Sequence, residues 1–192
     1  SLPIMMKKYD LIIVGAGIMG TFHALHAAKM GKKVLLLEKD NRPVGSTIQN
    51  FGQVVPSGLD AYWQKFGIRS LEIFDELQAE ADFTLVKNGS VYLASDVEEL
   101  NLINEVSELH SNVGYSQEIL SKTATKVLFP DINSDYIKGS IFYPKEYSVN
   151  SSEFIYKLID YCQEKLGVEY KNHRAVISIE DQNGEVNVKT AE

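Results

Sequence analysis

The chain has 192 residues, of which 44% are hydrophobic and 23% are charged. This composition is typical of a globular chain that buries a hydrophobic core in one or two domains. The formal net charge is −7 and the sequence contains no clustered basic stretch. Because nucleic-acid binding requires a clustered basic surface, we expect no nucleic-acid partner.

The cysteine and histidine content argues against a disulfide and a metal site. The single cysteine, Cys162, lacks a partner for an internal disulfide, and its place in the apolar pattern of residues 154–166 predicts a core thiol. None of the histidines shows metal-ligand spacing with a second His, Cys or carboxylate, so no metal site is expected. These histidines are His23, His26, His110 and His173.

The N-terminal region contains an apolar run, residues 11–20, that superficially fits the core of a signal peptide. It is too short to span a bilayer, and no small-residue cleavage site follows it. We therefore expect a cytoplasmic protein without a membrane span. Residues 1–5 precede a candidate start at Met5 or Met6 and are left out of the fold argument.

The first predicted elements in the chain surround a glycine-rich segment, residues 15–20. The aliphatic run Leu11–Val14 before it predicts a strand, and residues 21–30 after it predict a helix with small residues on one face. A second apolar run, residues 34–37, predicts a strand that ends at the acid Glu38. This order and spacing predict a dinucleotide-binding βαβ unit.

Each glycine of this segment has a separate steric role. Gly15 allows the sharp turn out of the first strand, Gly17 leaves room for a pyrophosphate, and Gly20 lets the helix pack close to the strand. The helix is expected to begin near Ile18, where its free N–H groups and dipole meet the phosphate charge. Glu38 would accept hydrogen bonds from ribose hydroxyls, and its charge would repel the 2′-phosphate of NADP. FAD and NAD are not distinguished by these residues.

The loop after Glu38 indicates which dinucleotide is bound. Residues 39–53 are rich in turn formers and in hydroxyl and amide side chains, which is unusual for a plain NAD-binding domain. With Val14–Gly20, Glu38 and Gly45-Ser46-Thr47, the chain resembles the FAD-dependent oxidoreductases of the D-amino-acid oxidase family, which includes glycine oxidase and sarcosine oxidase. Residues 46–52 are similar to the bacterial branch associated with aminophosphonate breakdown. Gln49 stands where that branch has arginine, so the substrate stays open.

The resemblance implies a Rossmann-like FAD-binding domain of the α/β class with an inserted α+β substrate domain and an antiparallel sheet. It implies that the protein oxidises the C–N bond of a small amine, with oxygen or another acceptor reoxidising the flavin. Gln49 and Gln53, with Phe51, are weak candidates for the substrate side; Tyr143 and Tyr147 are weaker. No catalytic base is identified. The implied FAD-binding residues are Gly15, Gly17, Ile18, Met19, Gly20, Glu38, Lys39, Ser46, Thr47, Asn50, Phe51, Gly52 and Val176.

The middle of the chain predicts a helix followed by a small antiparallel sheet. Residues 59–81 predict an amphipathic helix, interrupted near Gly67, whose aromatic residues are expected in the core. Residues 83–94 predict a β-hairpin with an Asn88-Gly89 turn. Further predicted elements are a helix opened by Asp96, a short helix capped by Ser121, and a strand at residues 139–143.

The last part of the chain is expected to return to the nucleotide-binding domain. Residues 151–166 predict an amphipathic helix that ends at Gly167. Short strands are predicted at residues 168–170, 175–179 and 186–189, the last two joined at Asn183-Gly184. The expected domains are residues 6–81 and 150–192 for FAD binding and residues 82–149 for an inserted substrate-domain portion. We expect the sequence to be the N-terminal part of a longer enzyme.

Three functions remain open from the sequence. An FAD-dependent amine oxidoreductase fits the motifs and the loop. An NAD-linked dehydrogenase fits the βαβ unit but not the loop of residues 45–52 or the inserted section. A non-catalytic nucleotide-binding fragment is the third, if the chain lacks the part that completes the flavin site.

Overall fold

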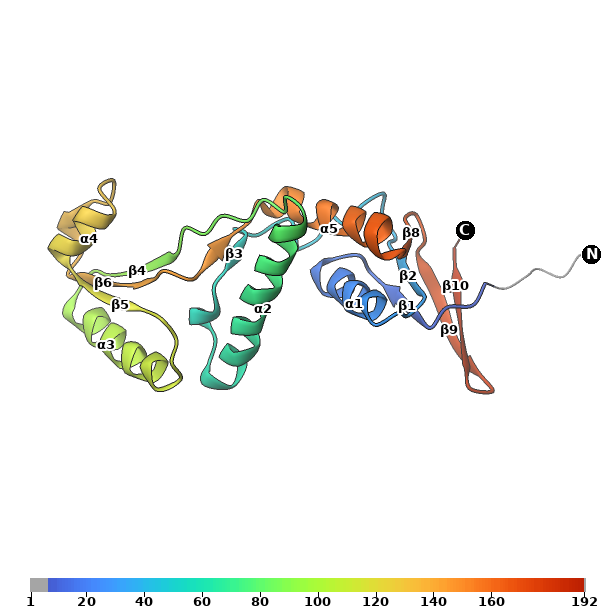
Figure 1. The fold of residues 1–192 in the computed structure, drawn as a ribbon, viewed down its shortest axis with the longest axis horizontal. Coiled ribbons are helices and arrows are strands. Elements are labelled where there is room, and N and C mark those ends of the chain that lie inside the picture. The colour runs from blue at the N-terminus through green and yellow to red at the C-terminus, as the bar shows by residue number, and fades with distance from the viewer. Residues whose placement is uncertain (1–6, 192) are drawn as a thin grey trace, which may run out of the picture. The chain divides into compact units, whose positions relative to one another are not determined.

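The computed structural model describes residues 7–191 (Figure 1). Met5 and Met6, at the expected start of the chain, lie outside the described residues. The chain forms two compact units, one of the segments up to Gly52 and from Asn150 onward, the other of Gln53–Val149. The sequence placed this boundary after residue 81 instead. The helix before residue 81 belongs to the second unit because its residue Leu71 is buried in the hydrophobic core of that unit.

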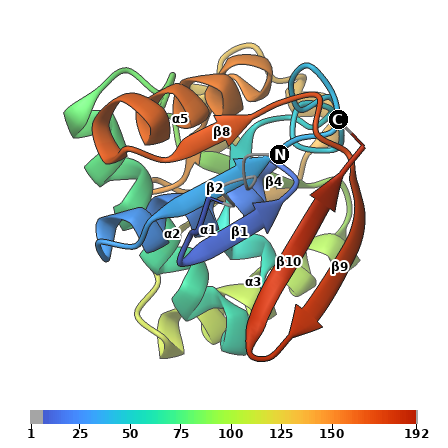
Figure 2. The ribbon, with the colours of Figure 1, turned by 90° about the vertical axis from the view of Figure 1, so that its right-hand side faces the viewer.

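The first unit is built on a parallel sheet in the order β1-β2-β8, shown in Figure 2. All four residues of β2 are buried, as expected for a central strand that is covered on both faces. The elements have the following bounds: β1 Leu11–Val14, α1 Ile18–Lys29, β2 Val34–Leu37, α5 Ser151–Leu166 and β8 Glu169–Lys171. This result confirms the predicted βαβ unit and the return of the chain to the same sheet.

Helices α1 and α5 pack against each other in the first unit. The rings of Phe22 and Phe154 stack with centroids 6.3 Å apart. The N-cap of α5 is Asn150, whose side chain accepts a hydrogen bond from Ser152 N, and its C-cap is Gly167, where φ is +69°. The left-handed conformation of Gly167 is a common helix end, as the sequence predicted.

A separate antiparallel hairpin ends the described chain. Strands β9 (Val176–Gln182) and β10 (Glu185–Thr190) are joined by Asn183 and Gly184, both with positive φ. Two central residues of this kind form the tight turn that matches the twist of paired strands. The structure confirms this hairpin.

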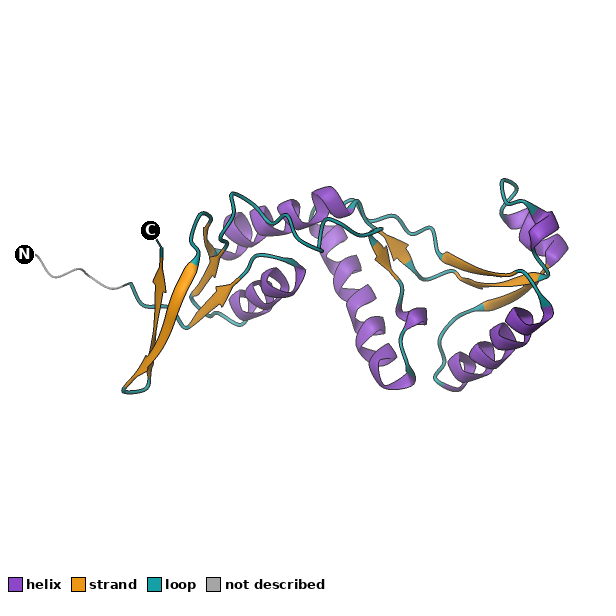
Figure 3. Ribbon diagram, turned by 180° about the vertical axis from the view of Figure 1, so that it is seen from behind, coloured by secondary structure: helices purple, strands orange, loops and turns teal. Residues whose placement is uncertain are grey.

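The second unit contains an antiparallel sheet in the order β4-β6-β5 and two smaller strands, β3 and β7, that pair with each other. The described helices and strands are coloured by type in Figure 3. Their bounds are β3 Gln53–Val54, η1 Pro56–Gly58, α2 Ala61–Glu80, β4 Ser90–Ala94, α3 Val97–Asn112, β5 Glu118–Ser121, α4 Lys122–Leu128, η2 Ser134–Tyr136, β6 Gly139–Tyr143 and β7 Tyr147–Ser148. The predicted antiparallel sheet is confirmed. So are the caps of α3 by Asp96 and α4 by Ser121.

Helix α2 differs from its sequence prediction in two ways. It runs without interruption through Gly67, where an added Cβ would lie 2.8 Å from side-chain atoms of Pro56 and Leu59. The glycine therefore serves close packing against η1 rather than a break. Trp63 and Phe66 were expected in the core but are 55% and 48% exposed.

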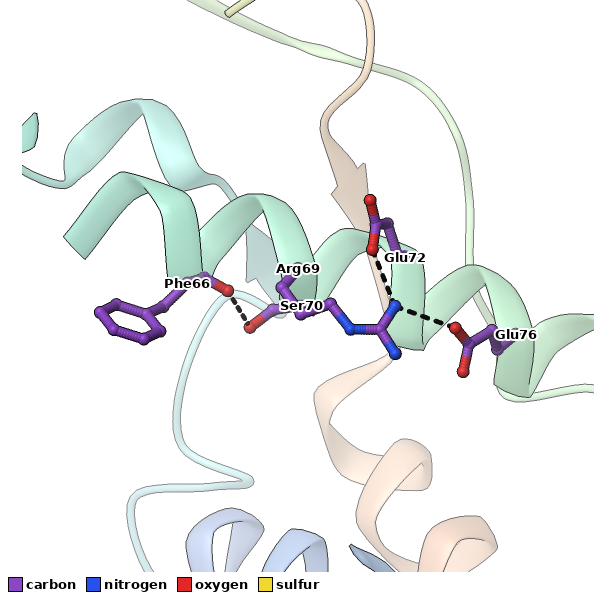
Figure 4. A network of polar contacts seen from close by, with 5 residues as sticks. All are labelled: Phe66, Arg69, Ser70, Glu72 and Glu76. Atoms are coloured by element: carbon purple, nitrogen blue, oxygen red, sulfur yellow. Dashed lines mark hydrogen bonds and ion pairs between the residues drawn. The ribbon is translucent and has the colours of Figure 1, made fainter. Parts of the chain in front are cut away.

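The exposed side of α2 also carries an ionic network, shown in Figure 4. Arg69 Nη1 donates to Glu72 Oε2 at 2.7 Å and to Glu76 Oε1 at 3.0 Å. Nearby, Ser70 Oγ donates to the carbonyl of Phe66. Because all three charged side chains are half-exposed, this network is a solvated surface feature.

The predicted hairpin at residues 83–94 is wrong. Strand β4 pairs with β6 instead, and Val86 forms an isolated bridge to Ser148. Gly89 has the positive φ, +70°, that a hairpin turn can require. Its N–H, however, donates to the carbonyl of Glu146, far along the chain, and not to a residue of the expected hairpin. The chain therefore does not fold back on itself at Asn88-Gly89. It pairs with Ser148 before these residues and with β6 after them.

Candidate dinucleotide site

The turn from β1 into α1 requires glycine at two described positions. Gly15 has φ of +99°, a backbone conformation that other residues rarely adopt. A Cβ at Gly20 would lie 1.9 Å from the carbonyl oxygen of Gly15 and 3.2 Å from Ile13 Cγ2. The absence of that Cβ confirms that Gly20 allows the helix to approach the strand.

The N-terminus of α1 is capped by a side chain from the following loop. Gly17 is the N-cap residue and has no side chain, but Thr47 Oγ1 accepts a hydrogen bond from Ile18 N at 3.0 Å. A Cβ at Gly17 would lie 3.2 Å from the same Thr47 oxygen. The loop hydroxyl thus lies beside the free N–H groups that a helix N-terminus presents to an anion.

The loop that carries Thr47 is held by its own amide side chains. Asn50 Nδ2 donates to the carbonyls of Ser46 and Thr47, and Asn50 Oδ1 accepts from Gly52 N at 2.7 Å. Ser151 Oγ, at the start of α5, donates to the carbonyl of Asn50 at 2.8 Å. These bonds fix the loop in the conformation that places Thr47 at the N-terminus of α1.

Glu38 follows β2 and is 7% exposed. Its Oε2 accepts from Ala16 N at 3.0 Å and its Oε1 accepts from Asp40 N at 3.1 Å. An ionised carboxylate has about four acceptor positions, so both oxygens retain capacity for ribose hydroxyls. The backbone of Glu38 is fixed as well, since its N–H donates to Lys171 and its carbonyl accepts from Arg174 N.

These groups line one cavity of about 460 Å³ within the first unit. The helix turn, the acid after β2, the loop and the first residues before β9 all contribute to it. The lining residues are Val14, Gly15, Gly17, Leu37, Glu38, Lys39, Asp40, Pro43, Val44, Gly45, Ser46, Thr47, Arg174, Ala175 and Val176. A glycine turn, a helix N-terminus and a carboxylate around one cavity fit a dinucleotide.

The structure brings most predicted cofactor residues together. Gly15, Gly17, Glu38, Lys39, Ser46, Thr47 and Val176 line the cavity. Other predicted residues are outside its lining: Ile18, Met19, Gly20, Asn50, Phe51 and Gly52. Of these, Ile18 and Gly20 form the helix turn and Asn50 holds the loop, whereas Phe51 is 92% exposed. The roles of all these residues toward a ligand stay predictions.

Sequence reasoning did not single out several lining residues. Pro43 is held by Tyr156, whose hydroxyl donates to the Pro43 carbonyl at 2.9 Å. Arg42, which is outside the lining, lies over the Tyr156 ring at 4.7 Å from its centroid. Arg174 reaches the cavity because its backbone pairs with Glu38, a contact that the register of β8 beside β2 creates. No sequence pattern indicated this position, because the adjacency of β8 to β2 is set by the fold.

The weak substrate candidates are dispersed. Gln49 is exposed and donates to the Val44 carbonyl, and Gln53 lies in β3 of the second unit. Tyr143 and Tyr147 are buried in the second unit, where Tyr143 bonds His110 and Tyr147 donates to Asp75. Burial raises the pKa of Tyr147 to about 12, with Asp75 adding to the effect.

Cys162 is fully buried in α5, and burial raises the pKa of its thiol to about 12. This confirms the predicted core thiol. Among residues 7–191, no group of three or more His, Cys, Asp or Glu side chains is placed to hold a metal ion. In the same part of the chain, no helix combines the length and apolar character that crossing a membrane requires.

Comparison with known proteins identifies the family. The profile of the family described as "FAD dependent oxidoreductase" matches residues 10–192. The chain is 28% identical over 206 residues to "Probable oxidoreductase OrdL" of Haemophilus influenzae, covering 97% of this chain and 46% of that protein. It is 26% identical over 180 residues to the mitochondrial pyruvate dehydrogenase phosphatase regulatory subunit of Mus musculus, covering 92% of this chain and 20% of that protein.

The fold is similar to that of a solved oxidase. Glycine oxidase from Geobacillus kaustophilus superposes with a TM-score of 0.87 at 19% identity, covering 97% of this chain and 52% of that chain. The chain thus spans less than half of the two relatives above and about half of this solved chain. The family profile covers the glycine turn, Glu38 and the loop that together form the cavity. The chain belongs to the FAD-dependent oxidoreductase family, whose cofactor is FAD.

Proposed function

We propose that the first unit binds the ADP part of FAD in the cavity described above. The observation that carries this proposal is the convergence of Gly15, Gly17 and the Glu38 carboxylate on one cavity at the N-terminus of α1. The helix N-terminus and Thr47 would receive the pyrophosphate, with Ser46 beside them. Glu38 would accept from the adenosine ribose, with Lys39 next to it.

The remaining cofactor contacts are proposed from the same arrangement. Val176, which lines the cavity at the start of β9, would offer backbone groups to adenine. Residues 50–52 would run beside the flavin ring. The helix turn at residues 18–20 would complete the pyrophosphate site. In this proposal the segments up to Gly52 and from Asn150 form the FAD-binding domain, and Gln53–Val149 contributes to a substrate domain.

We further propose that the protein containing this chain oxidises a small amine or amino acid. Family membership and the likeness to glycine oxidase support this substrate class. The flavin would accept a hydride at N5 from the carbon that bears the nitrogen, and oxygen or another acceptor would take the electrons onward. The described residues would hold the cofactor in place, because the side chains of Glu38 and Thr47 are themselves fixed by hydrogen bonds from backbone N–H groups.

An aminophosphonate is the finer substrate proposal. It rests on the similarity of residues 46–52 to the branch associated with aminophosphonate breakdown. Gln49 and Gln53 are the proposed substrate-side residues, with Phe51, whose exposed ring is available to a ligand. Gln49 in place of arginine would give weaker attraction to a phosphonate, since an amide carries no charge.

The test combines binding and turnover. The chain is titrated into FAD while flavin fluorescence is recorded, with NAD as the competitor. Saturable binding of FAD that NAD does not displace supports the proposal, whereas preference for NAD would indicate the dehydrogenase alternative. The flavin-loaded protein is then mixed anaerobically with glycine, sarcosine or aminomethylphosphonate, and separately with glycerol 3-phosphate as a substrate without nitrogen. Bleaching of the flavin absorbance at about 450 nm by an amine supports the substrate class, whereas bleaching only by glycerol 3-phosphate would contradict it.

A further inference from the structure

The second unit contains a cavity of about 300 Å³ between helix α3 and the β4–β6 sheet. Its apolar wall includes Leu102, Ile103 and Val106 from α3 and Ile141 from β6. Three hydroxyl side chains, Ser57, Tyr92 and Tyr143, lie among its lining residues, and the Tyr143 hydroxyl is already hydrogen-bonded to His110. An apolar cavity with a few polar groups is the usual form of a small-molecule site.

A buried carboxylate lies behind the polar lining. Glu146 is 0% exposed and accepts from Ser57 N at 2.7 Å, from Ser57 Oγ at 2.9 Å and from Tyr115 OH at 2.9 Å. Ser90 Oγ is a further donor to the same carboxylate. All these partners are neutral donors, which suits an ionised, acceptor-only carboxylate. A negative charge is thus held close to Ser57 without a cationic partner in this set.

The hydrogen-bond directions fix what the cavity offers to a ligand. Ser57 Oγ has a single proton and donates it to Glu146, so the 3.1 Å bond between Ser57 Oγ and Tyr92 OH must be donated by Tyr92. The Tyr92 oxygen then has only lone pairs to offer. Tyr92 lines the cavity and its hydrogen bond to Ser57 is exposed, so this acceptor is accessible to a ligand there. A group that binds there has to donate a hydrogen bond.

The charges of the site favour a cation as that donor. The Glu146 carboxylate is linked to the Tyr92 oxygen through the Ser57 hydroxyl. Glu99 is an acid in the described cavity lining, and this lining contains no Lys or Arg. A primary ammonium group donates three hydrogen bonds and carries the complementary charge. We propose that this cavity binds a small primary ammonium ion with an apolar tail, with the ammonium group at Tyr92 and the tail against α3.

This site shares no lining residue with the dinucleotide cavity. The inference therefore does not depend on the proposed FAD binding. Failure of either one leaves the other intact, because ammonium binding is measured without flavin.

The experiment compares ligands that share one tail. The ¹⁵N-labelled chain is titrated with n-hexylamine, n-hexanol and hexanoate at pH 7, and backbone amide shifts are followed by NMR. We expect saturable shifts in β4 and α3 with n-hexylamine, about tenfold weaker binding of the alcohol, and no binding of hexanoate. Equal affinities for amine and alcohol, or shifts confined to other segments, would overturn the proposal.

Two pairs of variants locate the two ends of the ligand. Tyr92→Phe removes the acceptor and should weaken n-hexylamine about tenfold, whereas Tyr136→Phe, at an exposed tyrosine outside the lining, should not. Leu102→Trp should block the cavity, and Leu109→Trp, on the same helix but outside the lining, should not. Leu102 is 58% exposed, so its replacement leaves the fold intact. Unchanged binding in both Tyr92→Phe and Leu102→Trp would disprove the assignment.

Discussion

Thr47 Oγ1 accepts a hydrogen bond from the backbone N–H of Ile18 at 3.0 Å, although the two residues are 29 positions apart. The bond joins the loop after Glu38 to the first turn of α1. It satisfies one of the free N–H groups that Gly17, lacking a side chain, leaves without a local cap. The loop and the helix are therefore joined at the proposed pyrophosphate site.

Replacement of Thr47 tests this relationship. Thr47→Val keeps the shape of the side chain but removes the acceptor, and should lower the free energy of unfolding by about 1 kcal/mol. The same variant should also weaken FAD binding, because the loop hydroxyl no longer meets the pyrophosphate. Thr47→Ser retains the hydroxyl and should behave like the parent in both urea unfolding and FAD titration. If Thr47→Val matched Thr47→Ser, the proposed role of the hydroxyl would be wrong.

Replacement of Gly20 tests the close approach of helix and strand. In Gly20→Ala the new methyl group would lie 1.9 Å from the Gly15 carbonyl oxygen. The backbone must move to relieve this clash, which should cost about 1–3 kcal/mol of stability. Gly45→Ala is the matched control, since a Cβ there meets nothing within 4 Å. Thermal unfolding followed by circular dichroism compares the two, and equal melting temperatures would contradict the close-packing role.

Glu38 is expected to determine affinity for the ribose. Glu38→Gln removes the charge while keeping the size, and a hydrogen bond to a charged group contributes about 1.5–3 kcal/mol. The dissociation constant for FAD should therefore rise about tenfold or more. Glu180→Gln, on exposed β9, is the control and should leave binding unchanged. A parallel unfolding measurement separates lost affinity from lost structure.

Acid stability of the first unit should depend on Glu169. Hydrogen bonds from Lys7 and Tyr9 lower the pKa of this carboxyl from its ordinary value of 4.5 to about 2. Because the folded pKa is the lower one, the stabilisation is complete above pH 4.5 and is lost as the pH falls toward 2. The free energy of unfolding, measured with urea across this pH range, should decline as the pH falls. The decline should be smaller in Glu169→Gln. A parallel decline in both proteins would exclude Glu169 as its source.

Cys162 provides a probe of global unfolding. Its thiol is fully buried, and burial raises its pKa to about 12, so the thiolate that reacts with disulfide reagents is scarce in the folded protein. We expect slow reaction with dithiobis-nitrobenzoate in buffer and rapid reaction in denaturant. Rapid labelling of the folded chain would show that α5 opens locally.

The first unit could be predicted closely from sequence because its signals are local. Gly15, Gly20 and Glu38 each have a steric or electrostatic role that follows from their place between two apolar runs. The second unit was predicted less well, because its partners are distant in sequence. Gly89 resembled a hairpin turn, but its N–H bonds Glu146 in a later segment. Arg174 in the dinucleotide cavity depended in the same way on strand order, which periodicity does not reveal.

The aromatic residues of α2 show a second limit of sequence patterns. Trp63 and Phe66 share the helical spacing of Leu71, but Leu71 is buried in the core cluster and the two aromatic rings are not. Periodicity identifies a helix face and not the extent to which neighbours cover it. Sequence patterns also missed the Glu146 carboxylate and its donors Ser57, Ser90 and Tyr115, since these four residues are brought together only by the fold.

The most direct test of the central claim is a fluorescence titration of FAD with the purified chain and with Glu38→Gln. The parent chain should bind FAD saturably, NAD should not displace the FAD, and the variant should have a dissociation constant at least about tenfold higher. A folded parent chain that leaves FAD fluorescence unchanged, or that binds FAD equally well without the Glu38 charge, would contradict it.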